Sequence, residues 1–238
     1  MSPLFYFSGN LAPNDRIALP EDTARHLVQV LRKTVGYEFL LTDGKGTRAE
    51  VRIVETGKKT ATVQVLFTTF SPQISPRFTL AVAFTKATAR NEWLLEKSTE
   101  LGVARILPLI TQRSETEKFR AERWTNILIS AMQQSQQYWL PQLHTPLRLE
   151  AFWKEFSGNN SRFIAHCISE ETRQPLSQVL QRGEDTLLMI GPEGDFSPEE
   201  VAAALENGFQ PVTLGNTRLR TETAAMAGMA YFRLLNDH

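Results

Sequence analysis

The chain has 238 residues, 42% of them apolar, which is enough for a packed core in one large domain or two small ones. Its 26 Lys and Arg residues balance 26 Asp and Glu residues, which excludes a protein that coats nucleic acid through bulk positive charge. No apolar run reaches the roughly 18 residues that span a bilayer, no signal-peptide pattern opens the chain, and there is a single cysteine, so we expect a cytoplasmic protein without membrane segments.

The first part of the chain is predicted to form a small β domain. One helix is expected over about residues 21–33. Three runs with the character of strands follow, at 37–41, 48–54 and 60–67. Glycine-bearing turns, Asp43-Gly44-Lys45-Gly46 and Gly57-Lys58-Lys59, separate them, and this meander spacing is typical of small barrels.

A linker is predicted at Ser71-Pro72-Gln73-Ile74-Ser75-Pro76. Two prolines and two serines interrupt the apolar pattern there, and each residue before a proline favours extended chain. We therefore expect one domain over 1–72 and a second over 77–238.

Strand-like and helical segments alternate after the linker. The expected strands lie at 78–84, 105–110, 162–168, 187–190 and 211–214. The expected helices lie at about 91–101, 121–137, 175–181, 198–207 and 222–236. Ser197 and Glu200 form a capping-box pattern around Pro198 at the start of one helix. This alternation predicts an α/β domain with a mostly parallel sheet and helices on both faces. Cys167 lies in one of the apolar runs and is expected to be a buried core thiol.

Two glycine-bearing turns directly follow the last two predicted strands. They read Gly191-Pro192-Glu193-Gly194-Asp195-Phe196 and Leu214-Gly215-Asn216-Thr217-Arg218-Leu219-Arg220-Thr221-Glu222. The carboxyl ends of strands are where open α/β sheets bind ligands, and glycine lets the backbone approach a ligand closely. Neither turn has the glycine spacing of a phosphate-binding loop, so the sequence predicts a small-molecule ligand other than a nucleotide polyphosphate.

These two turns resemble the cofactor-binding half of the SPOUT methyltransferases, and in particular the bacterial small-subunit ribosomal RNA uracil-N3 methyltransferase family. Two further segments fit that family in the same order. They are His26 to Arg32 with the Asp43-Gly44-Lys45-Gly46 turn, and Lys86 with Glu96-Lys97-Ser98-Thr99-Glu100-Leu101-Gly102-Val103. One departure is that Gln133 and Gln137 stand where the family usually has Glu and Arg, so no role of those two charges carries over.

The resemblance implies the architecture and the partners. It implies a PUA-like RNA-binding β-barrel over 1–72 and a SPOUT domain over 77–238, with a trefoil knot at about 187–225. It also implies S-adenosylmethionine as cofactor, 16S ribosomal RNA or the small ribosomal subunit as substrate, and a homodimer. No spacing of His, Cys or acidic residues indicates a metal site.

Specific residues follow from the same likeness. The residues expected to bind the cofactor are Leu188, Ile190, Gly191, Pro192, Gly194, Leu214, Gly215, Leu219 and Thr221. The residues expected to contact RNA are chosen by their charge, and His26 by its place before Arg32 on the N-terminal helix. They are His26, Arg32, Lys86, Arg90 and Arg113.

The expected chemistry is removal of a proton from uracil N3 as the methyl group arrives. N3 is protonated at neutral pH, so a base or an adjacent cation is needed. Arg220 would position the uracil or its phosphate, and Glu193 or Glu222 would lie near the departing proton. Two alternatives remain at this stage: a SPOUT ribose 2′-O-methyltransferase acting on rRNA or tRNA, and a non-catalytic RNA-binding ribosome assembly factor.

Overall fold

The protein is described by a computed structural model that covers residues 2–114, 118–156, 161–168 and 172–237. It divides into two compact units. One comprises Met1–Gln73 with Met132–Leu140, and the other comprises Ile74–Ala131 with Pro141–His238. The expected domains, 1–72 and 77–238, stay a prediction, and they did not place residues 132–140 with the N-terminal unit.

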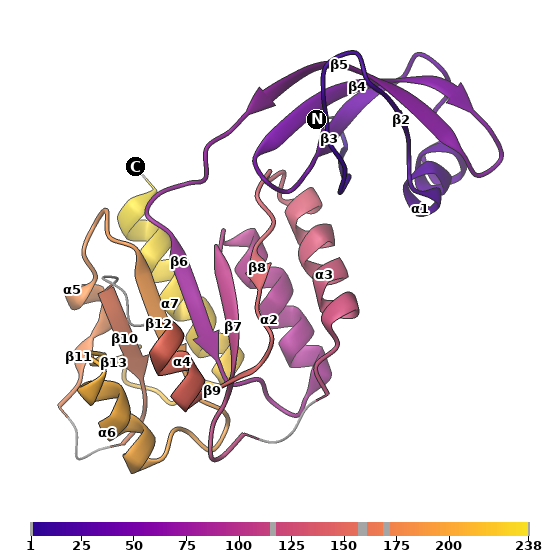
Figure 1. Cartoon of the computed structure of the whole chain (residues 1–238). Coiled ribbons are helices and arrows are strands. Elements are labelled where there is room, and N and C mark those ends of the chain that lie inside the picture. The colour runs from indigo at the N-terminus through magenta and orange to yellow at the C-terminus, as the bar shows by residue number, and fades with distance from the viewer. Residues whose placement is uncertain (1, 115–117, 157–160, 169–171, 238) are drawn as a thin grey trace. The chain divides into compact units, whose positions relative to one another are not determined.

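The N-terminal unit is built on a five-stranded sheet in the order β1-β3-β4-β5-β2 (Figure 1). Its strands are β1 (Leu4–Tyr6), β2 (Arg16–Ala18), β3 (Glu38–Thr42), β4 (Thr47–Thr56) and β5 (Ala61–Phe70). β1 runs parallel to β3, and the other neighbours are antiparallel. The expected helix is α1 (Glu21–Arg25) continued by a π-helix, η1 (His26–Val30).

Alternation along these strands separates a core face from an outer face. Phe39, Val51 and Val63 are buried in the core, and Leu27 of η1 packs into the same cluster. Because strand side chains alternate, the charged residues of β4 lie on the opposite face.

Residues 132–140 pack on the turn between β3 and β4. The Gly46 amide donates to the Tyr138 carbonyl at 2.9 Å, and the Trp139 indole donates to the Ser71 carbonyl at 2.8 Å. Gly46 has φ of +97°, and a Cβ on it would lie 2.7 Å from the Trp139 ring. The turn therefore needs glycine both for its backbone conformation and for the close approach of Trp139.

The second unit contains a parallel sheet in the order β11-β13-β10-β12-β6-β7-β8, with β9 also paired to β7. All of these pairs are parallel. The strands are β6 (Phe78–Val82), β7 (Arg105–Ile110), β8 (Gln142–Leu143), β9 (Leu147–Arg148), β10 (Ser161–Ala165), β11 (Gln174–Pro175), β12 (Thr186–Ile190) and β13 (Gln210–Thr213).

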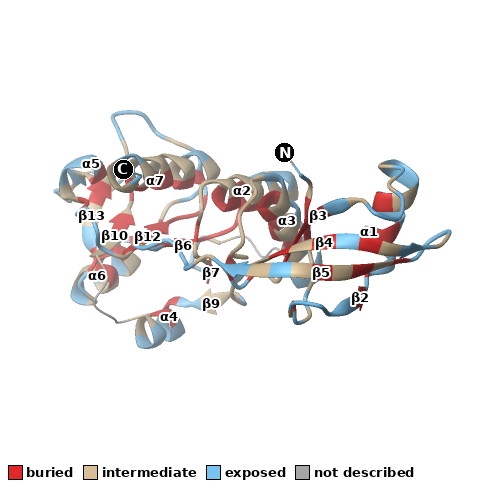
Figure 2. Ribbon diagram, turned by 90° about the horizontal axis from the view of Figure 1, so that it is seen from above, coloured by how far each residue is buried: buried red, intermediate tan, exposed pale blue. Residues whose placement is uncertain are grey.

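Helices cover both faces of this sheet. The helices are α2 (Thr88–Glu100), α3 (Ala121–Gln134), α4 (Leu149–Glu155), α5 (Leu176–Val179), α6 (Pro198–Glu206) and α7 (Thr221–Asn236). Figure 2 shows α2 and α7 on one side of the strands and α4 and α6 on the other. Leu187 and Met189 of β12 share a cluster with the α4–α6 face, whereas a Cβ at Gly228 of α7 would collide with Leu188. Within the described ranges, no helix combines the length and apolarity required to traverse a lipid bilayer.

The predicted secondary structure is confirmed for the expected strands and helices, with small shifts at their ends. The capping box is confirmed as well: the Ser197 hydroxyl accepts from the Glu200 amide, and the Glu200 carboxylate accepts from the Ser197 amide. The sequence missed α4 and the short strands β1, β2, β8, β9 and β11. The prediction of a buried Cys167 is wrong, because β10 ends at Ala165 and Cys167 is exposed beyond it.

Candidate functional site

A cavity of about 880 Å³ opens at the carboxyl ends of β10, β12 and β13. Both glycine-bearing turns line it, as do the residues that follow β10. These three strands are adjacent in the sheet, with β10 between β12 and β13. The cavity therefore lies where parallel α/β sheets bind ligands, and its volume is in the range of about 300–1,000 Å³ typical of small-molecule sites.

The turn after β12 is tied to its surroundings by Asp195, which takes a left-handed conformation with φ of +63°. Its carboxylate accepts from its neighbour's amide, Phe196 N, at 2.8 Å and from the Cys167 amide at 2.7 Å. Arg113, which does not line the cavity, donates from its guanidinium to the Gly194 carbonyl at 2.8 Å. These contacts fix the backbone of the turn against the end of β10.

The backbone of the turn after β13 has free space beside it at Gly215. Gly215 has φ of +129°, and a Cβ on it would have no heavy atom within 4 Å. The Thr213 hydroxyl donates to the Gly215 carbonyl at 2.8 Å. At the end of this segment the buried Thr221 hydroxyl donates to the Gly191 carbonyl at 3.0 Å, which joins the two turns.

A set of charged residues connects the cavity wall with α2 and α7. Arg220 and Glu193 line it. The Arg90 guanidinium lies 3.8 Å from both the Glu193 and the Glu222 carboxylates. The Glu222 side chain is only 12% exposed, and its Oε2 has no hydrogen-bond partner among the described residues. Arg90 therefore bridges a carboxylate on the cavity wall and a carboxylate held beside it.

Most of the residues expected to bind the cofactor come together here. Those on the cavity wall are Ile190, Gly191, Pro192, Leu214, Gly215, Leu219 and Thr221. Leu188 and Gly194 are not on it, because Leu188 faces Gly228 of α7 and Gly194 lies beneath Arg113. Among the expected catalytic residues, Arg220 and Glu193 line the cavity and Glu222 does not.

The sequence missed the part of the wall that comes from the end of β10. Ala165, His166, Cys167 and Arg173 line the cavity, as does Asp195. Periodicity shows that a strand is present but not which strand lies next to it. Asp195 belongs to the turn that the sequence singles out, but nothing in the sequence signals its bond to Cys167.

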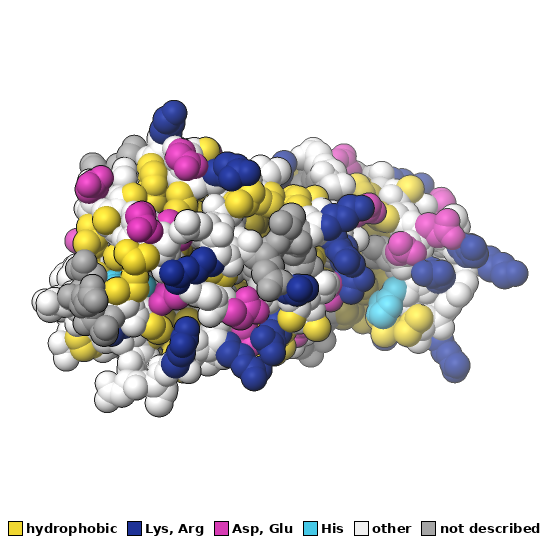
Figure 3. All heavy atoms as spheres, turned by 90° about the horizontal axis from the view of Figure 1, so that it is seen from below, with side chains coloured by type: hydrophobic (Ala, Val, Ile, Leu, Met, Phe, Trp, Pro, Cys, Tyr) yellow, Lys and Arg dark blue, Asp and Glu magenta, His cyan; other side chains and the backbone are white. Residues whose placement is uncertain are grey.

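The residues expected to contact RNA lie in both units. His26 and Arg32 are exposed in the N-terminal unit, and Lys86, Arg90 and Arg113 belong to the second unit. Arg90 is engaged by carboxylates and Arg113 by backbone carbonyls. On the face shown in Figure 3, basic side chains are interspersed with acidic and apolar ones.

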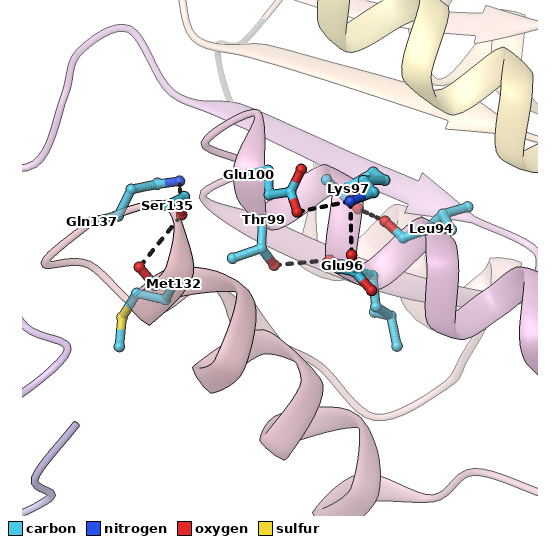
Figure 4. Close-up of polar contacts among 10 residues, drawn as sticks. Leu94, Glu96, Lys97, Thr99, Glu100, Met132, Ser135 and Gln137 are labelled. Atoms are coloured by element: carbon cyan, nitrogen blue, oxygen red, sulfur yellow. Dashed lines mark hydrogen bonds and ion pairs between the residues drawn. The ribbon is translucent and has the colours of Figure 1, made fainter. Parts of the chain in front are cut away.

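The segment that resembles the family's middle signature forms the end of α2. Figure 4 shows Lys97 between Glu96 and Glu100, with its ammonium 2.7 Å and 2.8 Å from their carboxylates. Hydrogen bonds to Glu100 and then Glu96 raise the pKa of Lys97. In the same view the Gln137 amide, at a position where the family has Arg, donates to the Ser135 hydroxyl at 2.9 Å.

A parallel sheet with a ligand-sized cavity at its carboxyl edge, in a chain that also has a small β unit, defines a two-unit α/β protein with a small-molecule site. The family model described as the RNA methyltransferase domain matches residues 73–233, and the RNA methyltransferase PUA domain matches residues 19–66. The chain belongs to this RNA methyltransferase family. The expected family and fold class, a SPOUT domain with a PUA-like domain, are thereby confirmed, whereas the knot stays a prediction.

Three similar proteins match almost the whole chain. The ribosomal RNA small subunit methyltransferase E of Rickettsia conorii is 30% identical over 98% of this chain and 96% of its own. A crystal structure of a probable rRNA-methyltransferase from Porphyromonas gingivalis is 37% identical, with a TM-score of 0.89 over 99% of this chain and 98% of that one. The structure of ribosomal RNA small subunit methyltransferase E from Neisseria gonorrhoeae, bound to S-adenosyl methionine, is 31% identical, with a TM-score of 0.88 over the same shares.

Proposed function

We propose that this protein transfers a methyl group from S-adenosylmethionine to N3 of a uridine in 16S ribosomal RNA of the small ribosomal subunit. The observation that carries the proposal is the cavity formed by the two joined turns, in a chain similar over nearly its whole length to a structure with S-adenosyl methionine bound. The choice of N3 rests on the family resemblance of the two turns.

The cavity residues fit this cofactor. Apolar side chains such as Ile190, Leu214 and Leu219 suit the adenine ring, and the open backbone at Gly215 leaves peptide groups accessible for its polar edge. Asp195 and Arg173 bring opposite charges to the wall, which suits the ammonium and carboxylate of the methionine part. When bound, S-adenosylmethionine supplies an electrophilic methyl group.

Glu193 is better placed than Glu222 to receive the N3 proton. Glu193 lies on the cavity wall, whereas Glu222 does not, so substrate can reach Glu193 directly. Arg220, also on the wall, would stabilise the negative charge that develops on the uracil when the proton leaves. Together these residues provide the base and the cation that the reaction needs.

Glu222 and Arg90 would act by positioning. Arg90 lies between the two carboxylates at equal distances of 3.8 Å, so Glu222 holds Arg90 in place and Arg90 orients Glu193. In this proposal Arg90 belongs to the proton-transfer apparatus and not to the contacts with RNA phosphates.

The remaining expectations also belong to this proposal. The knot over 187–225 rests on the family resemblance, and the bond from Thr221 to Gly191 lies within that range, where it holds the start of α7 against the end of β12. Exposed apolar side chains on α2 and α7, Trp93 and Leu234, support a homodimer. Action on ribosomal RNA implies a cytoplasmic location, and His26, Arg32, Lys86 and Arg113 remain candidates for RNA contacts.

A single-turnover reaction tests the proposal. Small ribosomal subunits that lack the modification are mixed with the protein and S-adenosylmethionine, and the digested RNA is analysed by nucleoside mass spectrometry. We expect 3-methyluridine. A product methylated on ribose would favour the 2′-O-methyltransferase alternative, and cofactor binding without methyl transfer to any RNA would favour the assembly factor.

A further inference from the structure

A second cavity, of about 370 Å³, lies within the N-terminal unit and is separate from the cofactor site. Its wall includes Ser2 before β1, Leu40, Arg48 and Glu50 on the β3–β4 ladder, and Gln136 and Tyr138 from the segment packed on that unit. The volume falls within the range of about 300–1,000 Å³ in which small ligands bind.

Backbone contacts hold the wall of this cavity in place. The Tyr138 carbonyl accepts from the Gly46 amide at 2.9 Å and from the Thr42 hydroxyl at 3.3 Å. Thr42 and Arg48 are direct partners in the β3–β4 ladder. Gln136 has φ of +58°, and its amide donates to the Gln133 carbonyl at 3.0 Å. The wall of this cavity is therefore held by hydrogen bonds within the unit.

The polar groups on the wall suit a neutral ligand with both donors and acceptors. The Arg48 guanidinium donates to Glu50 at 3.0 Å, but its Nε is buried without a hydrogen-bond partner among the described residues. A buried N–H without an acceptor is costly, so a ligand acceptor would stabilise it. Glu38, the other carboxylate of the wall, is engaged by Arg52 at 2.7 Å and 2.9 Å. Paired charges disfavour a phosphate here.

We propose that this cavity binds an unstacked guanine base of the RNA substrate. Guanine presents the acceptors O6 and N7 on one edge, which match the Arg48 guanidinium, and the donor N1–H beside O6 on its Watson–Crick edge, which matches the Glu50 carboxylate. Proteins recognise single-stranded RNA by holding splayed bases through such hydrogen bonds and by stacking them on aromatic residues, and Tyr138 lies on the wall. The inference rests on the proposed function in that it takes RNA as the substrate.

Fluorescence anisotropy with two short single-stranded RNAs tests the proposal. Both are oligouridines, one with a central guanosine and one with a central adenosine. The wild-type protein should bind the guanosine RNA at least about tenfold more tightly, the scale of one good bidentate contact. Arg48→Gln should abolish that preference and leave S-adenosylmethionine affinity unchanged.

Arg52→Gln is the matched control. Arg52 lies four residues along β4 from Arg48 on the same face, carries the same charge and is also paired with a glutamate, but it does not line the cavity. Its replacement should leave the preference for guanosine intact. If both variants lower the affinity equally for both RNAs, the cavity is not a base site and only bulk charge is at work.

Two further results would also overturn the proposal: equal or undetectable binding of the two RNAs by the wild-type protein, or an unchanged preference in Arg48→Gln. If Arg48→Gln does not fold, Gln136→Gly replaces it, since glycine tolerates the positive φ while losing the wall side chain. That variant must then weaken the preference. The proposed methylation is measured separately on ribosomal subunits, so either idea can fail alone.

Discussion

The Thr221 hydroxyl donates to the Gly191 carbonyl at 3.0 Å, and this bond joins the first residue of α7 to the turn after β12. Thr221 is only 4% exposed, so the bond is shielded from water. Both turns line the same cavity. This buried side-chain hydrogen bond therefore helps to fix the mutual position of the two turns that shape the cavity.

Thr221→Val should destabilise the protein and weaken cofactor binding together. Valine has nearly the same shape but leaves the Gly191 carbonyl without its donor, which should lower the free energy of unfolding by about 1–3 kcal/mol. Thr186→Val is the control, because Thr186 is also buried but lies at the other end of β12. Urea unfolding and calorimetric titration with S-adenosylmethionine measure both effects. Equal losses of cofactor affinity in the two variants would contradict the role of the bond.

Gly215→Val should weaken S-adenosylmethionine binding by at least about tenfold, because an added side chain crowds the cavity and overpacking costs about 1–3 kcal/mol. Gly183→Val is matched to it: Gly183 also has a positive φ, +83°, and open space around its missing Cβ, but it is outside the cavity. Both variants carry the same kind of backbone strain. If calorimetry shows the same affinity loss in both, strain and not crowding is the cause.

The position of the cofactor turns could be predicted from sequence because the signals are local. A short apolar run followed by glycine marks the end of a strand, and Ser197 and Glu200 mark the start of the next helix. The side chains that fix the turns were not predictable, because their partners are distant in the chain. Asp195 bonds to Cys167, 28 residues away, and this requires knowing that β10 lies beside β12.

The same limit explains the wrong prediction for Cys167 and the contacts of residues 132–140 that the sequence did not indicate. The apolar run around Cys167 continues past the end of β10. The sequence pattern therefore predicts a longer strand with a buried thiol, whereas Cys167 is exposed. Residues 132–140 were assigned to the second domain by their place in the chain, yet Trp139 packs at Gly46. The Asp43-Gly44-Lys45-Gly46 turn is evident in the sequence, but nothing in the sequence indicates that Tyr138 and Trp139 pack on it.

Arg220→Ala should reduce methyl transfer by at least about 100-fold, the scale of losing one positioned electrostatic group, with cofactor affinity little changed. Arg220 lines the cavity, where a cation can stabilise the uracil anion. Arg233→Ala, near the other end of α7, removes the same charge from a pair with Asp237 and serves as control. Single-turnover rates on unmodified small subunits compare the two. Near wild-type rates for Arg220→Ala would remove Arg220 from the mechanism.

His144 should make stability fall as the pH is lowered. Burial lowers the pKa of His144; Glu155 acts against that shift and Arg105 adds to it. Below the unfolded pKa of about 6.5 the unfolded chain takes up a proton that the folded protein resists, so stability declines until the pH passes the folded pKa. His144→Gln should flatten the slope of unfolding free energy between about pH 7.5 and about pH 5.5, and Glu155→Gln should steepen it. If the unfolding free energy of the wild type, His144→Gln and Glu155→Gln changes with pH at the same slope, His144 is not the group responsible.

The pH dependence of two matched variants should identify the base. Glu193→Gln removes a carboxylate from the cavity wall, and Glu222→Gln removes one that contacts Arg90 beside it. If Glu193 takes the N3 proton, its variant should be slower by about 100-fold or more near neutral pH, where about 100-fold is the lower end of the range for general-base catalysis. That deficit should shrink as the pH rises, because N3 then loses its proton without help.

Glu222→Gln should show a smaller deficit that does not change with pH, since Glu222 only positions Arg90. Single-turnover rates on unmodified subunits across the alkaline range measure both. A deficit that shrinks with pH in Glu222→Gln and stays constant in Glu193→Gln would reverse the two roles.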